Sequence, residues 1–366
     1  METKHSVIIG QSQKMDKIKD SSVHLVVTSP PYPMIEMWDE IMAKQNHEIK
    51  SALEKNDGNK AFELMHKELD KVWAEVNRVL IPGGFACINI GDATRTLNGE
   101  FSLYSNHARI ISSFISLGLS NLPNIIWRKQ TNAPNKFMGS GMLPSGAYVT
   151  LEHEWILILR KGSKRNIKSE DEKLLRKKSA FFWEERNTWF SDMWDLKGTK
   201  QKINGSETRQ RSAAYPYELP YRLINMYSIK GDTILDPFLG TGTTMLAAMA
   251  TERNSIGIEI DNAFSSIISD NITNTPTSQL NELIKARIEQ HEYFVTERAK
   301  DPKKKDILHF NTNLKLPVIT SQETEIELNF VKGIKKHMDN TFHASYTNEY
   351  TPKHKIKKES QILIEL

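Results

Sequence analysis

Apolar and polar positions alternate along this chain in segments that predict an α/β fold. Apolar side chains recur at helical spacing in residues 11–20, 39–77 and 106–117. Short apolar runs between and after these segments have the length and composition of buried strands. Strands that alternate with helices are typical of a parallel sheet covered by helices, so we expect an open α/β sheet. The predicted strands are residues 7–9, 23–27, 85–90, 125–127, 152–159, 233–236 and 255–260.

One βαβ unit, residues 233–261, is the stretch around which the chain is organised. A strand ending in Asp236 is followed by a loop with Gly240 and Gly242, an alanine-rich helix, and a second strand that carries Glu259. In such a unit the glycines let the backbone approach a ligand, and the acid accepts hydrogen bonds from ribose hydroxyls. A lone glycine pair also fits a simple tight turn, but the acids at both ends favour a nucleoside-binding unit.

The residues after the glycine pair restrict the kind of nucleoside. Gly242 is followed by Thr243, Thr244 and Met245. A phosphate-binding P-loop needs a lysine after its last glycine, and the dinucleotide fingerprint needs a third glycine where Met245 stands. A cofactor with a ribose and an adenine but no phosphate therefore fits the loop better than a nucleotide.

A second candidate site follows the strand at 23–27, where residues 28–32 read TSPPY. Two consecutive prolines end a sheet ladder, so this segment lies at the carboxyl end of a parallel strand, where open α/β sheets place their sites. Taken alone, the segment is also compatible with a Pro-Pro turn beside a packed tyrosine. The apolar residues that follow, 33–41, would either wall a pocket or pack in the core.

Together the two stretches resemble a known family. The segment 236–244, DPFLGTGTT, resembles the S-adenosylmethionine-binding motif of amino-methylating DNA methyltransferases, and TSPPY at 28–32 resembles their catalytic motif. LIPGG at 80–84 and HEWIL at 153–157 also look like family sequence. The resemblance covers residues 7–264 and implies an α/β, Rossmann-like S-adenosylmethionine-dependent methyltransferase sheet with an inserted DNA-recognition module.

The resemblance also implies roles for individual residues. Ser29 Oγ and the Pro30 carbonyl would accept the hydrogens of an exocyclic amino group, Pro31 would complete the catalytic motif, and Tyr32 would stack on a base flipped out of the duplex. The cofactor-binding residues that it implies are Asp236, Pro237, Phe238, Gly240, Gly242, Thr243, Thr244 and Glu259.

The order of the motifs, catalytic before cofactor-binding, resembles the β group of these enzymes. Family members with Ser in the first position of the catalytic tetrapeptide mostly methylate cytosine N4, and those with Asp or Asn there mostly adenine N6. By this resemblance, Ser29 implies methylation of cytosine N4 in a short duplex site. The methylation would protect DNA from a cognate restriction endonuclease. Adenine-N6 methylation, a catalytically inactive DNA-binding module and a dehydrogenase are the alternatives.

The resemblance, together with a change of composition after residue 160, divides the chain into four parts. Residues 1–160 would form the catalytic half of the methyltransferase domain, 212–275 the cofactor-binding half, and 276–366 an extension of unknown role. Between the two halves, 161–211 interleaves Lys and Arg with aromatic residues and is our candidate target-recognition region, because basic residues neutralise phosphates. A solvated basic face on a small subdomain is the alternative.

The net charge and the cysteine count restrict the partners and the cellular compartment that we expect for this chain. The net charge of +4 and a pI near 8.8 are compatible with double-stranded DNA as a partner without requiring it. The single cysteine, Cys87, excludes a disulfide framework; it lies mid-strand after Ala86, unlike the nucleophile of carbon-5 cytosine methylation. No metal site or membrane-spanning stretch is indicated. We expect a cytoplasmic monomer or dimer, with any cognate restriction endonuclease acting separately.

Overall fold

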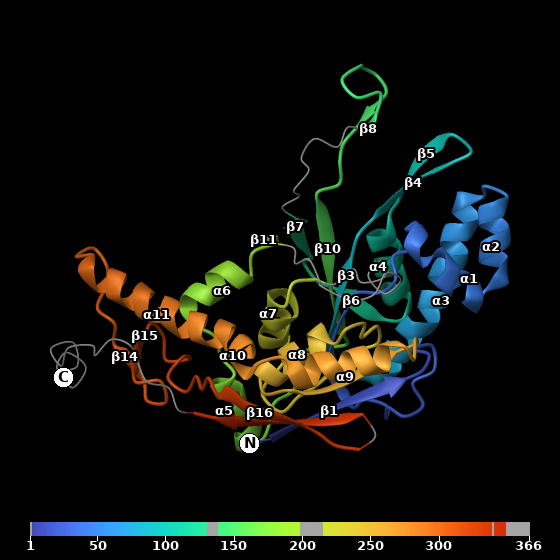
Figure 1. Ribbon diagram of the computed structural model, residues 1–366. Coiled ribbons are helices and arrows are strands. Elements are labelled where there is room, and N and C mark those ends of the chain that lie inside the picture. Colours follow the sequence, from blue (N-terminus) through green and yellow to red (C-terminus); the bar gives the residue numbers. More distant parts are fainter. Residues whose placement is uncertain (1, 130–137, 198–214, 339, 349–366) are drawn as a thin grey trace.

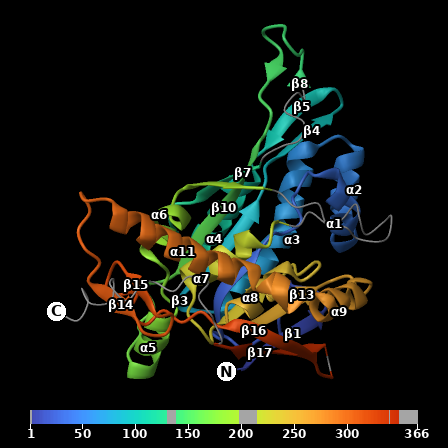
Figure 2. The ribbon, with the colours of Figure 1, turned by 60° about the vertical axis from the view of Figure 1, so that its left-hand side comes forward.

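The structure is a computed structural model that describes residues 2–129, 138–197, 215–338 and 340–348 (Figure 1). An 11-stranded sheet forms its centre, and helices cover both faces (Figures 1 and 2). The predicted α/β fold is therefore confirmed. In spatial order the strands are β11 (Met193–Leu196), β7 (Ile125–Lys129), β10 (His153–Lys161), β3 (Leu80–Ile90), β2 (Val23–Thr28), β12 (Thr233–Asp236), β13 (Asn254–Glu259), β1 (Glu2–Ile9), β17 (Thr341–Thr347) and β16 (Phe330–Lys336), and β6 (Leu119–Asn121) pairs with β10.

The middle of the sheet is parallel. Strands β3, β2, β12, β13 and β1 run in one direction, and β10 enters antiparallel between β3 and β7. Leu25 and Val27 of β2 pack into the core on one face of the sheet, and Val26 packs on the other. Burial on both faces explains why this strand reads as a continuous apolar run. Because the strands are parallel, β2, β12 and β13 end at the same edge of the sheet.

Two helical layers enclose the sheet. In the first layer the rings of Trp73 and Phe114 pack with centroids 5.1 Å apart. In the second layer Leu219, Ala248 and Ile288 share one core beneath the opposite face. The first layer holds α1 (Asp39–Gln45), α2 (His47–Glu54), α3 (Gly58–Val79) and α4 (Asn106–Ser116), and the second holds α7 (Glu218–Tyr227), α8 (Thr243–Ala250), α9 (Phe264–Asn274), α10 (Thr277–Leu280) and α11 (Glu282–Lys300).

The prediction of a helix at residues 11–20 is wrong, because the chain forms a series of turns there. Met15 and Ile18 are buried, as the spacing predicted. Their backbone groups, however, bond to α3: the Arg78 guanidinium donates to the carbonyls of Met15 and Ile18 at 3.0 Å each, and the Met15 N–H donates to Glu75 at 2.7 Å. Side chains distant in sequence thus replace the bonds of a helix.

The C-terminal extension completes the fold. Strand β17 pairs antiparallel with β1 and carries β16 beyond it, and a small sheet of β14 (His309–Asn311) and β15 (Leu316–Val318) lies after α11. Arg287 of α11 makes a buried ion pair with Glu185 in α6 (Trp183–Trp189), whose Nη2–Oε2 distance is 2.9 Å.

The described part of the candidate target-recognition region, 161–197, therefore shares a core with the extension. It also contains α5 (Glu170–Lys178). Residues 198–211 of that region lie outside the described residues. No helix in the described part of the chain is long and apolar enough to cross a membrane.

Candidate active site

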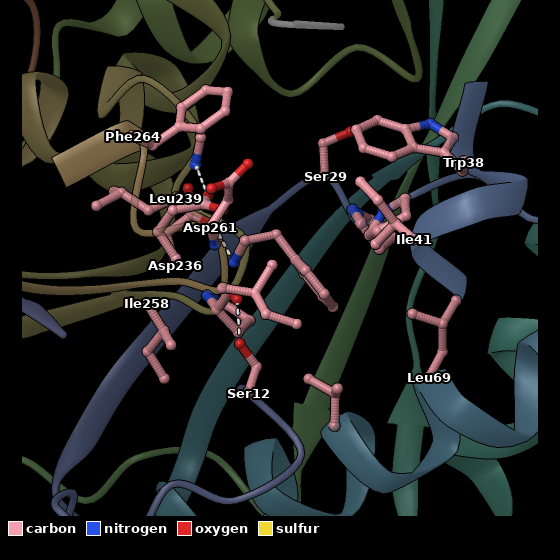
Figure 3. Close-up of a pocket in the computed structure, with 18 of the residues that line it drawn as sticks. Ser12, Ser29, Trp38, Ile41, Leu69, Asp236, Leu239, Ile258, Asp261 and Phe264 are labelled. Atoms are coloured by element: carbon pink, nitrogen blue, oxygen red, sulfur yellow. Dashed lines mark hydrogen bonds between the residues drawn. The ribbon is translucent and has the colours of Figure 1, made fainter. Parts of the chain in front are cut away.

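A pocket of about 1180 Å³, including its open mouth, lies at the carboxyl ends of β2, β12 and β13. Figure 3 shows Ser29 and Trp38 on one side of it, across from Asp261 and Phe264. The pocket brings the two sequence motifs together, as parallel strands ending at one edge require. The predicted site residues on its wall are Ser29, Pro30, Pro31, Asp236, Pro237, Phe238, Gly240, Thr243 and Glu259.

The glycine loop takes its shape from two positive backbone angles. Gly240 has φ +53° and Gly242 has φ +92°, in the left-handed region that a side chain disfavours. The Gly240 N–H donates to Glu259 Oε2 at 2.9 Å, which fixes the loop to β13. Gly242 immediately precedes α8 and does not line the pocket, so its contribution is to turn the chain into the helix.

Asp236 is a buried junction of four hydrogen bonds. Thr28 and Thr244 each donate a hydroxyl at 2.6 Å, and the Phe238 N–H donates at 3.0 Å. The Tyr215 hydroxyl adds a 3.5 Å contact. Burial raises the pKa of Asp236, and these donors oppose that shift by stabilising the carboxylate. Thr244 thus acts through Asp236 rather than on the pocket wall.

Glu259 holds its carboxylate at the pocket with backbone donors. Besides Gly240, the Asp261 N–H donates to Glu259 Oε1 at 3.0 Å. Burial raises the pKa of Glu259, while the two backbone donors lower it. Each carboxylate oxygen can accept a further bond, so the geometry suits a pair of ribose hydroxyls.

The charges around the pocket suit a cation that has no phosphate. Three acidic residues, Asp236, Glu259 and Asp261, lie on its wall, and no Lys or Arg is among its described lining residues. Many phosphate sites in proteins include Arg or Lys side chains. The lining therefore fits S-adenosylmethionine, which carries a sulfonium and a ribose, and agrees with the cofactor class expected from the glycine loop.

Beneath the pocket, Tyr32 belongs to a buried polar network. The Ser29 hydroxyl donates to the Tyr32 oxygen at 3.1 Å, and the Tyr32 hydroxyl donates to Glu154 Oε2 at 2.8 Å. The Asn89 amide donates to both, at 2.8 Å to Tyr32 and 2.7 Å to Glu154. The Tyr32 hydroxyl is thus fully used, with one donated and two accepted bonds.

The network continues outward through Lys129, which pairs with Glu154 Oε1 and is 41% exposed. Gly91 leaves space for the Tyr32 and Glu154 side chains, because a Cβ at this position would lie 3.0 Å from the Tyr32 ring and 3.3 Å from Glu154. Burial, and then the neighbouring Glu154 charge, raise the pKa of Tyr32 well above its usual value. The hydroxyl therefore stays protonated at neutral pH.

Sequence reasoning missed several of these residues. Asn89 and Glu154 carried a usable signal, since each is a polar residue inside a buried strand. The apolar segment 33–41 serves both of its expected roles: Trp38 lines the pocket, whereas Met34 packs in the core. The other wall residues, none of which was named individually as a site residue from the sequence, are Ser12, Gln13, Ile41, Met42, Gln45, Leu69, Val72, Tyr215, Leu239, Thr241, Ile258, Ile260, Asp261 and Phe264.

Comparison with known families gives one match that spans most of the chain. A family model described as DNA methylase (N6_N4_Mtase) matches residues 23–270. The matched residues include both the segment at 28–32 and the glycine loop at 236–244.

Two archaeal proteins are similar in sequence. The Type II methyltransferase M.MthZI of Methanothermobacter thermautotrophicus is 51% identical over 355 residues, covering 96% of this chain and 98% of that protein. The Type II methyltransferase M.MjaI of Methanocaldococcus jannaschii is 52% identical over 281 residues, covering 74% and 91%.

A solved structure is also similar. TTHA0409 of Thermus thermophilus, crystallised with S-adenosyl-L-methionine, aligns with a TM-score of 0.57 and 30% identity. The alignment covers 74% of this chain and 93% of that one.

Proposed function

The chain belongs to the DNA methylase family, and on this premise we propose that it methylates N4 of cytosine within a short duplex site. As a family member it is an S-adenosylmethionine-dependent DNA amino-methyltransferase. The observation that carries the proposal is Ser29, whose hydroxyl lines the pocket while its hydrogen is donated to Tyr32.

The reaction requires acceptors for an amino group that is a poor nucleophile. The nitrogen lone pair of a nucleobase amino group is delocalised into the ring, and accepting its hydrogens favours a nucleophilic, pyramidal nitrogen. Because the Ser29 hydrogen points to Tyr32, the Ser29 lone pairs are available as one acceptor. The Pro30 carbonyl supplies the second. Tyr32 keeps the proposed stacking role for its ring.

Bound S-adenosylmethionine supplies the methyl group as an electrophile on its sulfonium sulfur. The residues proposed to hold it are Glu259, at the ribose hydroxyls, and the loop of Asp236, Pro237, Phe238, Gly240 and Thr243, with Gly242 and Thr244 shaping the loop. The protein's part in the transfer is to align the nitrogen with the methyl carbon.

Methyl transfer forms a nitrogen–carbon bond, breaks a sulfur–carbon bond and releases one proton from the nitrogen. The chain of bonds from Ser29 through Tyr32 to Glu154 leads away from the pocket toward partly exposed Lys129. We propose that Glu154 receives this proton through Ser29 and Tyr32, each hydroxyl passing on one hydrogen as it takes up another. Glu154 then returns the proton to solvent.

The test is incubation of the purified protein with labelled S-adenosylmethionine and unmethylated genomic DNA, followed by nucleoside digestion and mass spectrometry. N4-methylcytosine is the expected product. N6-methyladenine would keep the mechanism and reverse the base assignment. A protein that binds DNA without a saturable S-adenosylmethionine site would be the inactive DNA-binding module.

The biological setting that we propose is restriction–modification, in which the enzyme protects DNA from a cognate endonuclease acting separately. Its relatives M.MthZI and M.MjaI carry Type II methyltransferase names. Residues 161–211 remain our candidate for target recognition. Trp189 and Trp194 of that region are buried in the core, so base contacts from this region would come from its other residues.

A further inference from the structure

Two hairpins project beyond the sheet on the same side of the molecule (Figures 1 and 2). One consists of β4 (Ala93–Leu97) and β5 (Glu100–Tyr104) and follows β3. The other consists of β8 (Met138–Gly139) and β9 (Ala147–Tyr148) and lies between β7 and β10. Strand β7 runs parallel to β3, so both hairpins start at the edge where the parallel strands end.

Residues that flank both hairpins are linked by hydrogen bonds or ion pairs to groups that contact or follow the catalytic segment, residues 28–32. At the base of the β8–β9 hairpin, Lys129 pairs with Glu154, which accepts the Tyr32 hydroxyl. At the base of the β4–β5 hairpin, the Asn106 amide donates to the carbonyls of Gly91 and Pro33 at 3.0 and 3.1 Å. Lys129 and Asn106, which flank the two hairpins in the sequence, therefore lie close to the residues that would receive the target base.

The tip of the β8–β9 hairpin is apolar and faces water. Met142 is 85% exposed and Leu143 is 70% exposed. Residues 138–150 contain no charged side chain, so this tip is not built to bind phosphates. Large apolar side chains gathered on a projecting tip indicate an interaction site.

The hairpin is nevertheless well formed. The Ser140 N–H donates to the Gly146 carbonyl at 2.9 Å. Gly139 has φ +68°, and a Cβ there would lie only 2.0 Å from the Gly146 oxygen. The Tyr148 ring stacks on Phe101 of the other hairpin, with centroids 4.5 Å apart and planes 5° from parallel. This stacking contact joins the β8–β9 hairpin to the β4–β5 hairpin.

We propose that the β8–β9 hairpin enters duplex DNA at the target base pair and that Met142 and Leu143 fill the space that the flipped base leaves. This inference rests on the proposed function, because a base must leave the stack before the pocket can receive it. Apolar wedges between bases offset part of the cost of unstacking, and burial removes their own surface from water. A neutral apolar tip suits the interior of the base stack better than the phosphate backbone.

The test replaces Met142 and Leu143 together by Ser. The matched control is Leu308→Ser, since Leu308 is 73% exposed in the loop before β14. Steady-state methylation is measured on a synthetic duplex that carries the site mapped by sequencing DNA methylated by the wild type. Each protein is also assayed on the same duplex with the target base mispaired, which lowers the cost of flipping.

The double variant is expected to raise the KM for the paired duplex by about tenfold or more, with S-adenosylmethionine affinity unchanged. On the mispaired duplex most of this loss should disappear, which a folding defect would not produce. The inference alone would be overturned if the double variant lost activity equally on both duplexes or lost none. It would also be overturned if Leu308→Ser showed the same loss of activity. A wild type that methylates no DNA would overturn the proposed function, and this inference with it.

Discussion

Thr28 and Asp236, 208 positions apart in the sequence, are joined by a buried 2.6 Å hydrogen bond from the threonine hydroxyl to Asp236 Oδ1. Thr28 is the last residue of β2, directly before the catalytic tetrapeptide, and Asp236 ends β12, directly before the glycine loop. The bond therefore fixes the spacing between the residues that would hold the base and those that would hold the cofactor.

Replacing Thr28 by Val keeps the shape of the side chain and removes this donor. We expect the free energy of unfolding to fall by about 1–2 kcal/mol, because the buried carboxylate loses one of its partners while Phe238 still donates to the same oxygen. Urea denaturation measures the change. Thr96→Val, at an exposed position of β4, is the control and should change stability little. Equal stability of Thr28→Val and the wild type would contradict this role.

Glu154→Gln tests the proton path below the pocket. Glu154 Oε2 accepts from Tyr32 and Asn89, and Oε1 faces Lys129, so an amide in either orientation turns N–H groups toward donors. We expect kcat to fall roughly 10²-fold, with the KM for S-adenosylmethionine unchanged. Glu152→Gln, at an exposed neighbouring position, is the control.

A second variant shows whether Glu154 acts through the tyrosine hydroxyl. Tyr32→Phe keeps the ring and removes the hydroxyl that joins Ser29 to Glu154. If these residues act as one path, the double variant should be little slower than either single variant. Fully additive losses of kcat would argue against the path and leave Glu154 with a packing role.

Ser29→Ala tests the proposed acceptor directly. Removing one of two acceptors for the amino hydrogens should lower kcat by roughly 10- to 100-fold, because the nitrogen then loses part of its alignment. Binding of S-adenosylmethionine, measured by calorimetry, should change little. Ser51→Ala, an exposed position in α2, serves as the control. A Ser29→Ala enzyme with full turnover would exclude the proposed role of Ser29.

The sequence was informative where neighbouring residues determine the structure. The apolar run of β2 and the prolines after it placed the catalytic segment at a strand end, and the glycines predicted the bend before α8. The turns at 11–20 could not be predicted locally, because Arg78, far along the chain, supplies the donors that a helix would have supplied itself. Helical spacing therefore predicted correctly that Met15 and Ile18 are buried, but it did not predict the conformation of their backbone.

The network below the pocket shows the same limit. Asn89 and Glu154 stand out as polar residues in buried strands, but the register of β10 against β3 decides which groups they meet. The meeting of the two motifs in one pocket could be expected from the resemblance to a family, and its contacts required the structure. The pairing of β17 with β1 likewise depends on two ends of the chain that no local pattern relates.

Glu259 gives the site a predictable response to pH. Burial raises its pKa above that of an ordinary glutamate, so the side chain takes up a proton at a higher pH than usual. The protonated form has fewer lone pairs for ribose hydroxyls. We therefore expect the affinity for S-adenosylmethionine, measured by calorimetry, to fall as the pH is lowered from about 7 to about 5.

The contribution of Glu259 to folding stability depends on pH in the opposite direction to its contribution to cofactor binding. A carboxyl whose pKa is raised in the folded state stabilises the protein at low pH and loses that contribution as the pH rises, so its protonation cannot unfold the chain. Glu259→Gln should bind more weakly at neutral pH and show a flatter pH dependence, whereas the exposed Glu100→Gln should behave like the wild type. A Glu259→Gln variant with the wild-type pH dependence would assign the titration to another group.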